Sequence, residues 1–134
     1  MNLTRSQLAK ESNINTETIR YYLKRGLVAE PPRTESGYRL FPTETVKRIS
    51  FIKRSQELGF TLEEIKELLT ISDHRSCHDA KEVKEITDNK IEQIEKKIKD
   101  LQRMKDALEL LSIECPGKGF SVDECSIIKS LAGE

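Results

Sequence analysis

The feature that most constrains the fold is a stretch from Ser76 to Cys115 with helical periodicity and no glycine or proline. Its apolar residues recur at steps of three and four and form one stripe, flanked by Glu and Lys. They are Val83, Ile86, Ile91, Ile94, Ile98, Leu101, Met104, Leu108 and Leu111. A stripe of this length predicts a coiled-coil helix, which needs a second helix to cover its apolar seam.

A cysteine stands at each end of this predicted helix. Ser76 is expected to cap it, with Cys77 in its first turn, where the positive end of the helix dipole favours the thiolate form. Cys115 is followed by Pro116 and Gly117, which end the helix. At 1.5 Å per residue, a straight helix separates the two thiols by roughly 55 Å. Two antiparallel copies would instead place Cys77 of one chain beside Cys115 of the other, giving two equivalent intersubunit sites. The alternative is that both cysteines are incidental.

The N-terminal region has the spacing of a helix-turn-helix. A capping box at residues 4–7 predicts a first helix to about Ser12, and Asn15 can cap a second helix that ends near Gly26. Four polar or aromatic residues share the outer face of the second helix. They are Glu17, Arg20, Tyr21 and Lys24. Such side chains reach phosphates or base edges in a major groove, although an ordinary solvated face has the same pattern.

A short hairpin is expected next, with Gly37 at its turn. A hairpin after a helix-turn-helix is a wing, and Arg33, Tyr38 and Arg39 supply hydrogen-bond donors on it.

Two further helices follow the hairpin. Thr43 is expected to cap a helix to about Leu58 that leaves Arg48 and Arg54 outside. A second capping box at residues 61–64 opens a fourth helix through Leu69.

The charge distribution agrees with a DNA-binding first half. Residues 1–60 contain 11 Lys and Arg against 6 Asp and Glu, a net charge of +5, and residues 61–134 contain 12 against 17, a net charge of −5. A basic half favours a polyanionic partner. Residues 1–5 begin a helix rather than an apolar leader, and no transmembrane-length segment follows, so we expect a cytoplasmic protein with no membrane partner. No catalytic constellation or phosphate loop is present, so we do not expect an enzyme.

Several short motifs are arranged as in a known family. They are Ile19-Arg20-Tyr21-Tyr22, Gly26-Leu27, Ser36-Gly37-Tyr38-Arg39 and Leu58-Gly59-Phe60-Thr61-Leu62. In their order and spacing the chain resembles the MerR family of bacterial transcription regulators over its whole length. The resemblance implies a mainly α fold with four parts: a winged helix-turn-helix DNA-binding domain with a second helical pair (1–71), a hinge (72–76), a long antiparallel coiled-coil dimerisation helix (77–114), and a short metal-binding loop and terminal helix (115–134).

The resemblance also implies partners and DNA-contacting residues. The partners are a second copy of the chain, palindromic promoter DNA, and RNA polymerase, which engages the promoter once the effector twists the DNA. Recognition-helix, wing and third-helix positions of the family map onto one set of residues here. That set is Thr16, Thr18, Arg20, Tyr21, Arg33, Tyr38, Arg39 and Arg54.

By the same resemblance, the metal site combines Cys77 of one subunit with Cys115 and Cys125 of the other. Three thiolates suit a soft ion, and Hg(II) is the expected effector, with Pb(II), Cd(II) or Zn(II) as alternatives. Zinc usually takes four protein ligands, and His74 or His78 would have to supply the fourth. The loop between Cys115 and Cys125 is one residue longer than is usual in mercury regulators. A thiol redox switch, in which Cys115 and Cys125 form a disulfide, also stays open.

Overall fold

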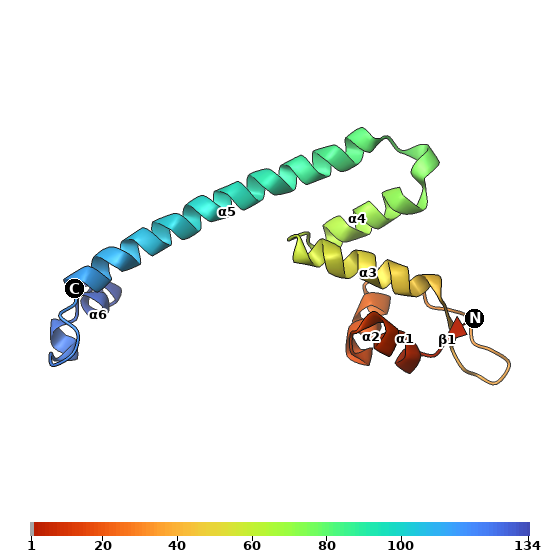
Figure 1. Ribbon diagram of the computed structural model, residues 1–134, viewed down its shortest axis with the longest axis horizontal. Coiled ribbons are helices and arrows are strands. Elements are labelled where there is room, and N and C mark those ends of the chain that lie inside the picture. Colours follow the sequence, from red (N-terminus) through yellow and green to blue (C-terminus); the bar gives the residue numbers. More distant parts are fainter. Residues whose placement is uncertain (1) are drawn as a thin grey trace. The chain divides into compact units, whose positions relative to one another are not determined.

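A computed structural model describes residues 2–134, and it is mainly helical, as expected (Figure 1). The elements follow in the order β1 (Asn2–Leu3), α1 (Arg5–Ser12), α2 (Thr16–Lys24), β2 (Phe41–Pro42), α3 (Glu44–Glu57), α4 (Leu62–Asp73), the 3₁₀ turn η1 (Arg75–Cys77), α5 (Ala80–Glu114), the 3₁₀ turn η2 (Val122–Glu124) and α6 (Ser126–Leu131). The chain divides into two compact units, the first ending at Thr87 and the second covering Asp88–Glu134. Within residues 2–134, no helix has the length and apolarity needed to cross a membrane.

The first unit is a winged helix-turn-helix followed by a helical pair. Thr4 caps α1 with a complete capping box to Gln7, and the Asn15 side chain caps α2 by accepting from the Thr18 N–H. Asn13, between the helices, adopts a left-handed conformation, with φ of 56°. The turn predicted between the two helices is therefore confirmed.

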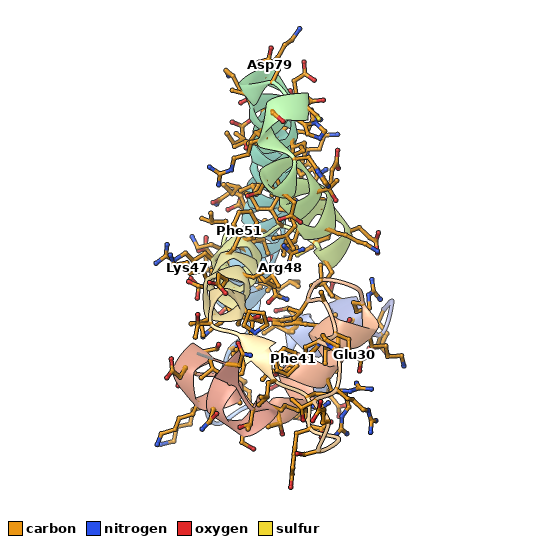
Figure 2. All side chains as sticks on the ribbon, turned by 90° about the vertical axis from the view of Figure 1, so that its right-hand side faces the viewer. Glu30, Phe41, Lys47, Arg48, Phe51 and Asp79 are labelled. Carbon is orange, nitrogen blue, oxygen red and sulfur yellow. The ribbon has the colours of Figure 1, made fainter. Side chains whose placement is uncertain are left out.

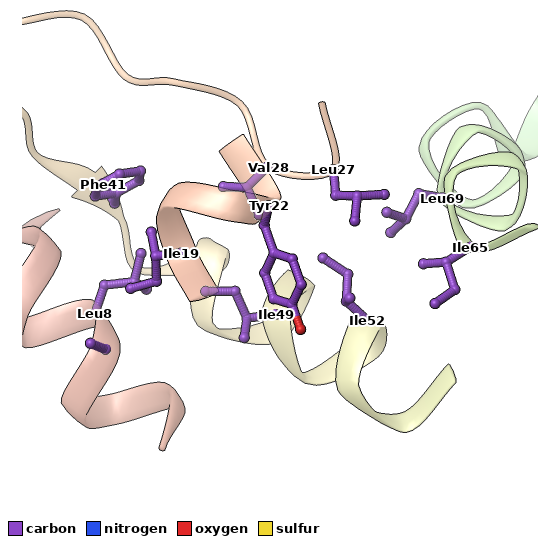
Figure 3. Packing of buried hydrophobic residues seen from close by; sticks show 11 residues of the cluster. Leu8, Ile19, Tyr22, Leu27, Val28, Phe41, Ile49, Ile52, Ile65 and Leu69 are labelled. Carbon is purple, nitrogen blue, oxygen red and sulfur yellow. The ribbon is translucent and has the colours of Figure 1, made fainter. Parts of the chain in front are cut away.

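The core of this unit is made of side chains from α1, α2, β2, α3 and α4 and from residues 27–28 after α2 (Figure 3). Leu8, Ile19 and Phe41 gather at one end of the cluster, and Leu27, Ile65 and Leu69 at the other. Tyr22, Ile49 and Ile52 lie between them. Each fully buried side chain of this size contributes about 1.5–3 kcal/mol of hydrophobic free energy. The core therefore fixes the exposed face of α2 relative to the wing.

Two expectations at the start of the chain and of α3 are wrong. Residues 2–3 do not begin a helix: they pair antiparallel with β2, Asn2 opposite Pro42 and Leu3 opposite Phe41. The capping box at Thr4 explains this, because it fixes the first helical residue as Arg5. At α3, the helix begins at Glu44 as predicted, but within the described residues the Thr43 side chain makes no capping hydrogen bond, since its backbone is already helical, with φ of −62° and ψ of −27°.

The start of the long helix also differs from expectation. Ser76 does not cap α5, which begins at Ala80. Asp79 takes that role: its Oδ1 accepts from the Lys81 N–H at 3.0 Å, and Glu82 Oε2 accepts from the Asp79 N–H at 3.2 Å. A carboxylate followed three residues later by Glu forms a better reciprocal cap than Ser76 followed by Asp79.

The apolar stripe of α5 is exposed in the single chain. The exposed members include Ile91, Ile94, Ile98, Leu101, Met104 and Leu108, from 37 to 63% exposed. Stable soluble proteins seldom leave so continuous an apolar strip in water. The 35-residue helix therefore needs a partner surface along this face.

Candidate metal centre and nucleic-acid interface

The outer face of α2 presents polar and aromatic side chains to solvent. Glu17, Arg20, Tyr21 and Lys24 are all exposed. Arg20 Nη1 lies 3.3 Å from Glu17 Oε1, and the Arg25 guanidinium lies 5.9 Å from the centre of the Tyr21 ring. Both contacts are at the surface, where ion pairs are weak, so these side chains are free to rearrange against a partner.

Thr16 and Thr18 differ from these residues because they are half-buried at the start of α2. The Thr18 hydroxyl donates to Asn15 Oδ1 at 2.9 Å, next to the 2.8 Å bond from its own backbone N–H. Thr18 therefore supports the cap of α2.

The predicted wing residues are brought together. An isolated antiparallel bridge joins Arg33 to Arg39, and Gly37 closes the turn with φ of 83°, a left-handed conformation that favours glycine. Tyr38 is 68% exposed and Arg33 is exposed. Arg39 is half-buried and ion-paired with Glu30. Two guanidinium groups and a phenol thus share one small loop.

Arg54 lies on α3 and is exposed as expected. It lines a surface hollow together with Lys53 and Glu57 rather than with the wing residues.

Arg48, which is labelled on α3 in Figure 2, is half-buried rather than solvent-facing as the sequence pattern suggested. Its Nε donates to the Leu27 carbonyl at 2.6 Å, and its Nη1 lies 3.0 Å from Asp73 Oδ1. The side chain joins the segment after α2 to the end of α4. Helical periodicity could not reveal this role, because both partners lie more than twenty residues away in the sequence.

The second unit brings two of the three cysteines together. The Cys115 thiol donates to the Cys125 sulfur with the two Sγ atoms 3.4 Å apart. The loop between them folds back on the end of α5, where the Ser126 hydroxyl donates to the Leu111 carbonyl at 2.6 Å. Both cysteines are half-buried. The geometry gives a soft ion two adjacent sulfur ligands.

The electrostatics at this pair favour a thiolate. The backbone N–H of Ile128, in the first turn of α6, and then the thiol of Cys115 hold the pKa of Cys125 below its usual value. A thiolate is the form that binds soft metals.

Cys77 lies in the first unit, at the end of η1, and is exposed. Cys77 lies three residues before Ala80, the first residue of α5, so it is not in the first turn of the helix as predicted. His78 Nδ1 lies 2.7 Å from Glu82 Oε2, and His74 is exposed at the end of α4. Among residues 2–134 of one chain, no group of three or more His, Cys, Asp or Glu side chains is arranged to hold a metal ion.

Sequence reasoning missed Arg5 and Arg48 as structurally important residues. Arg5 opens α1 and lines a hollow beside the wing, and its Nε is buried without a hydrogen-bond partner in the described part of the chain. The sequence did contain a signal for Arg5, because a cation in the first turn of a helix faces the positive end of the helix dipole and is unfavourable there.

Comparison with known proteins places these features in a family context. The family model described as "MerR HTH family regulatory protein" matches residues 3–70, and the model "MerR, DNA binding" matches residues 46–111. The mercuric resistance operon regulatory protein of Bacillus cereus is 46% identical over 127 residues, covering 93% of both chains.

Two solved structures are similar over nearly the full length. The regulator PbrR691 of Ralstonia metallidurans CH34, in complex with lead(II), has a TM-score of 0.84 at 32% identity and covers 96% of this chain and 98% of its own. The dual-function regulator MerR of Bacillus megaterium MB1, in complex with mercury(II), has a TM-score of 0.73 at 41% identity and covers 97% and 98%.

Proposed function

Because the chain belongs to the MerR family of helix-turn-helix regulatory proteins and is a metal-responsive transcription regulator, we propose that its effector is Hg(II). The observation that carries the proposal is the pair of sulfur atoms of Cys115 and Cys125, 3.4 Å apart with the pKa of Cys125 lowered. Hg(II) is a soft ion that binds thiolates in preference to harder ligands. The similarity to mercury-resistance regulators agrees with this choice.

The third ligand is Cys77 of the other subunit. The exposed apolar stripe of α5 is the surface on which two chains pair antiparallel, and this pairing carries the start of one α5 toward the end of the other. The exposed Cys77 of one subunit then completes a three-thiolate site with Cys115 and Cys125 of its partner. Each dimer holds two such sites.

The homodimer binds palindromic promoter DNA in the cytoplasm. The outer face of α2 and the wing make the DNA contacts, through Thr16, Thr18, Arg20, Tyr21, Arg33, Tyr38 and Arg39, with Arg54 on α3. Metal binding changes the shape of the DNA, so that RNA polymerase can engage the promoter. The controlled genes belong to a metal-resistance operon.

A subunit-mixing experiment tests the shared site. Cys77→Ser and Cys125→Ser chains are each expected to lose the three-thiolate charge-transfer absorption of Hg(II). When the two variants are co-expressed, mixed dimers keep one intact site, in which Cys77 from one chain meets both loop cysteines of the other. Because mixed dimers form about half of the population, about a quarter of the wild-type absorption should return. If no absorption returns in dimers verified as mixed, the intersubunit site is wrong.

The identity of the metal is tested by competition. Wild-type protein is titrated with Hg(II), Pb(II), Cd(II) and Zn(II) in the presence of a small competing thiol, and the ion that also switches transcription at the lowest free concentration is the effector. A preference for Pb(II) would agree instead with the similarity to PbrR691.

The short sulfur–sulfur distance also favours one rival, in which Cys115 and Cys125 form a regulatory disulfide. A normal metal response under strictly anaerobic reducing conditions would exclude it. If the response is absent there and appears on oxidation, the redox function replaces the metal function.

A further inference from the structure

Three arginines meet where the N-terminus of α1 lies beside the wing. β1 and β2 are antiparallel, with Leu3 opposite Phe41; Arg5 follows Leu3 by two residues and Arg39 precedes Phe41 by two. The isolated bridge pairs Arg39 with Arg33. The chain therefore brings Arg5 to the same end of the two-stranded sheet as the wing residues Arg33 and Arg39.

These residues line one hollow of about 570 Å³ at the surface of the first unit. Its lining has guanidinium, hydroxyl and phenol groups but no carboxylate. The lining residues are Thr4, Arg5, Ser6, Arg33, Gly37, Tyr38 and Arg39. A hollow with this chemistry suits an oxyanion.

The charges in the hollow are incompletely balanced. Of the three arginines, only Arg39 is ion-paired within residues 2–134, and its partner Glu30 does not line the hollow. Arg5 is the first residue of α1, and no acidic residue occupies that first turn. Like charges that line one hollow repel, and a cation at a helix N-terminus is unfavourable.

The buried Nε of Arg5 gives independent support. Within residues 2–134 this atom has no hydrogen-bond partner, and a buried donor left unsatisfied is unfavourable. An anion in the hollow would give the Arg5 guanidinium an acceptor and would reduce the repulsion among the three guanidinium groups. The hollow thus keeps an unsatisfied donor and unbalanced positive charge, and a negatively charged ligand would relieve both.

We propose that this hollow binds a phosphate group of the DNA backbone and that Arg5 is a direct ligand of that phosphate. The inference rests on the proposed DNA-binding function and adds α1 to the surface that contacts DNA. The hollow favours DNA over a free anion because Tyr38, 68% exposed at the tip of the wing, forms part of its rim. The same wing therefore contacts the groove edge while the hollow holds the adjacent phosphate.

The salt dependence of binding tests the proposal. The probe is a duplex that the wild-type protein selects from a random-sequence pool, and affinities are measured across a range of salt concentrations. Loss of one phosphate contact reduces the slope of log K against log salt by about 0.9, so Arg5→Gln should reduce it by about 1.8 in a dimer with two such hollows. Affinity near 0.1 M salt should fall by about tenfold per subunit. Arg103→Gln, an exposed arginine of α5 paired with Asp100, is the matched control and should leave the slope unchanged.

Single methylphosphonate substitutions then locate the contact. Methylphosphonate substitution at one phosphate position in each half-site should weaken binding of the wild-type protein. The same substitution should have little further effect on binding of the Arg5→Gln protein. Arg5→Lys keeps the charge but loses the planar fork, so it should recover only part of the affinity. Circular dichroism and the urea midpoint confirm that each variant is folded.

The outcomes separate the two proposals. If wild-type protein selects no sequence from the pool, the proposed DNA-binding function and this inference both fail. If selection succeeds but folded Arg5→Gln keeps the wild-type slope and affinity, only the role of Arg5 is overturned. If inorganic phosphate shifts the Arg5 Nε–H resonance while the slope is unchanged, the hollow is a free-anion site, which also overturns the proposal.

Discussion

Arg48 of α3 reaches both carboxylate oxygens of Asp73 at the end of α4, with Nη1 3.0 Å from Oδ1 and 3.1 Å from Oδ2. The same guanidinium donates to the Leu27 carbonyl. Asp73 lies four residues before Cys77, so this contact connects the segment carrying one proposed metal ligand to the DNA-binding part of the first unit. A single side chain thereby holds three segments in register.

Removing this contact should destabilise the protein. Arg48→Met keeps the apolar stem but leaves the Leu27 carbonyl without its donor, and an unsatisfied, partly buried carbonyl costs about 1–3 kcal/mol. Urea denaturation monitored by circular dichroism measures the change in the free energy of unfolding. Lys47→Met, at an exposed neighbouring position, is the control and should change it by less than about 0.5 kcal/mol. Equal urea midpoints for both variants would show that Arg48 does not hold these segments together.

The start of α5 provides a direct choice between the cap expected from the sequence and the one observed. Asp79→Ala removes the acceptor of the Lys81 N–H and should destabilise the first turn by about 1 kcal/mol. Ser76→Ala should have almost no effect, because Ser76 lies in η1. The rate of hydrogen exchange of the backbone amides at residues 80–83 measures the stability of this turn in each variant. Faster exchange in Ser76→Ala than in Asp79→Ala would restore the cap predicted from the sequence.

These contrasts show which parts of the fold are encoded locally. The caps at Thr4, Asn15 and Thr61, and the turn at Gly37, follow from side chains within four residues of each other, so the sequence pattern predicted them correctly. The pairing of Asn2 and Leu3 with β2 was missed because it joins residues almost forty apart. Two-residue strands have no periodicity that a sequence pattern can detect.

The candidate site divides in the same way. The exposed positions on α2 follow from helical spacing, and the structure places them as expected. The approach of Cys115 to Cys125 depends on how the intervening loop folds back, and the Ser126 contact with Leu111 that fixes it has no sequence signature. A site shared between two chains cannot be tested within one chain at all. Its geometry depends on the pairing of two α5 helices.

Cys125 should titrate at lower pH in the folded protein than in the unfolded chain. Its pKa is lowered by the Ile128 N–H and the Cys115 thiol, so between the folded and unfolded values only the folded chain carries the thiolate. The associated stability is present above the unfolded pKa and is lost as the pH falls through the folded pKa. Alkylation of the Cys125 peptide by iodoacetamide, followed by mass spectrometry across pH with and without urea, measures the shift.

The Cys115→Ala variant separates the two causes of this pKa shift. It removes the thiol donor but keeps the backbone N–H of Ile128, so the pKa of Cys125 should rise part of the way toward its usual value. Superimposable alkylation profiles in the native and urea-unfolded wild-type protein would contradict the lowered pKa.

Arg20→Ala tests whether the exposed face of α2 reads sequence or only binds phosphate. If Arg20 contacts a base edge, the variant should lose about 1–3 kcal/mol of binding to a selected duplex and much less to random duplexes. An equal loss on both would assign Arg20 to the backbone alone, because phosphate contacts do not depend on sequence. Glu17→Gln is the matched control. It releases Arg20 from its 3.3 Å ion pair while keeping the guanidinium, so it should bind the selected duplex at least as tightly as the wild type. Since Arg20 is a surface residue, its loss should leave the urea midpoint almost unchanged, and a weakened complex then reports on DNA contact rather than on folding.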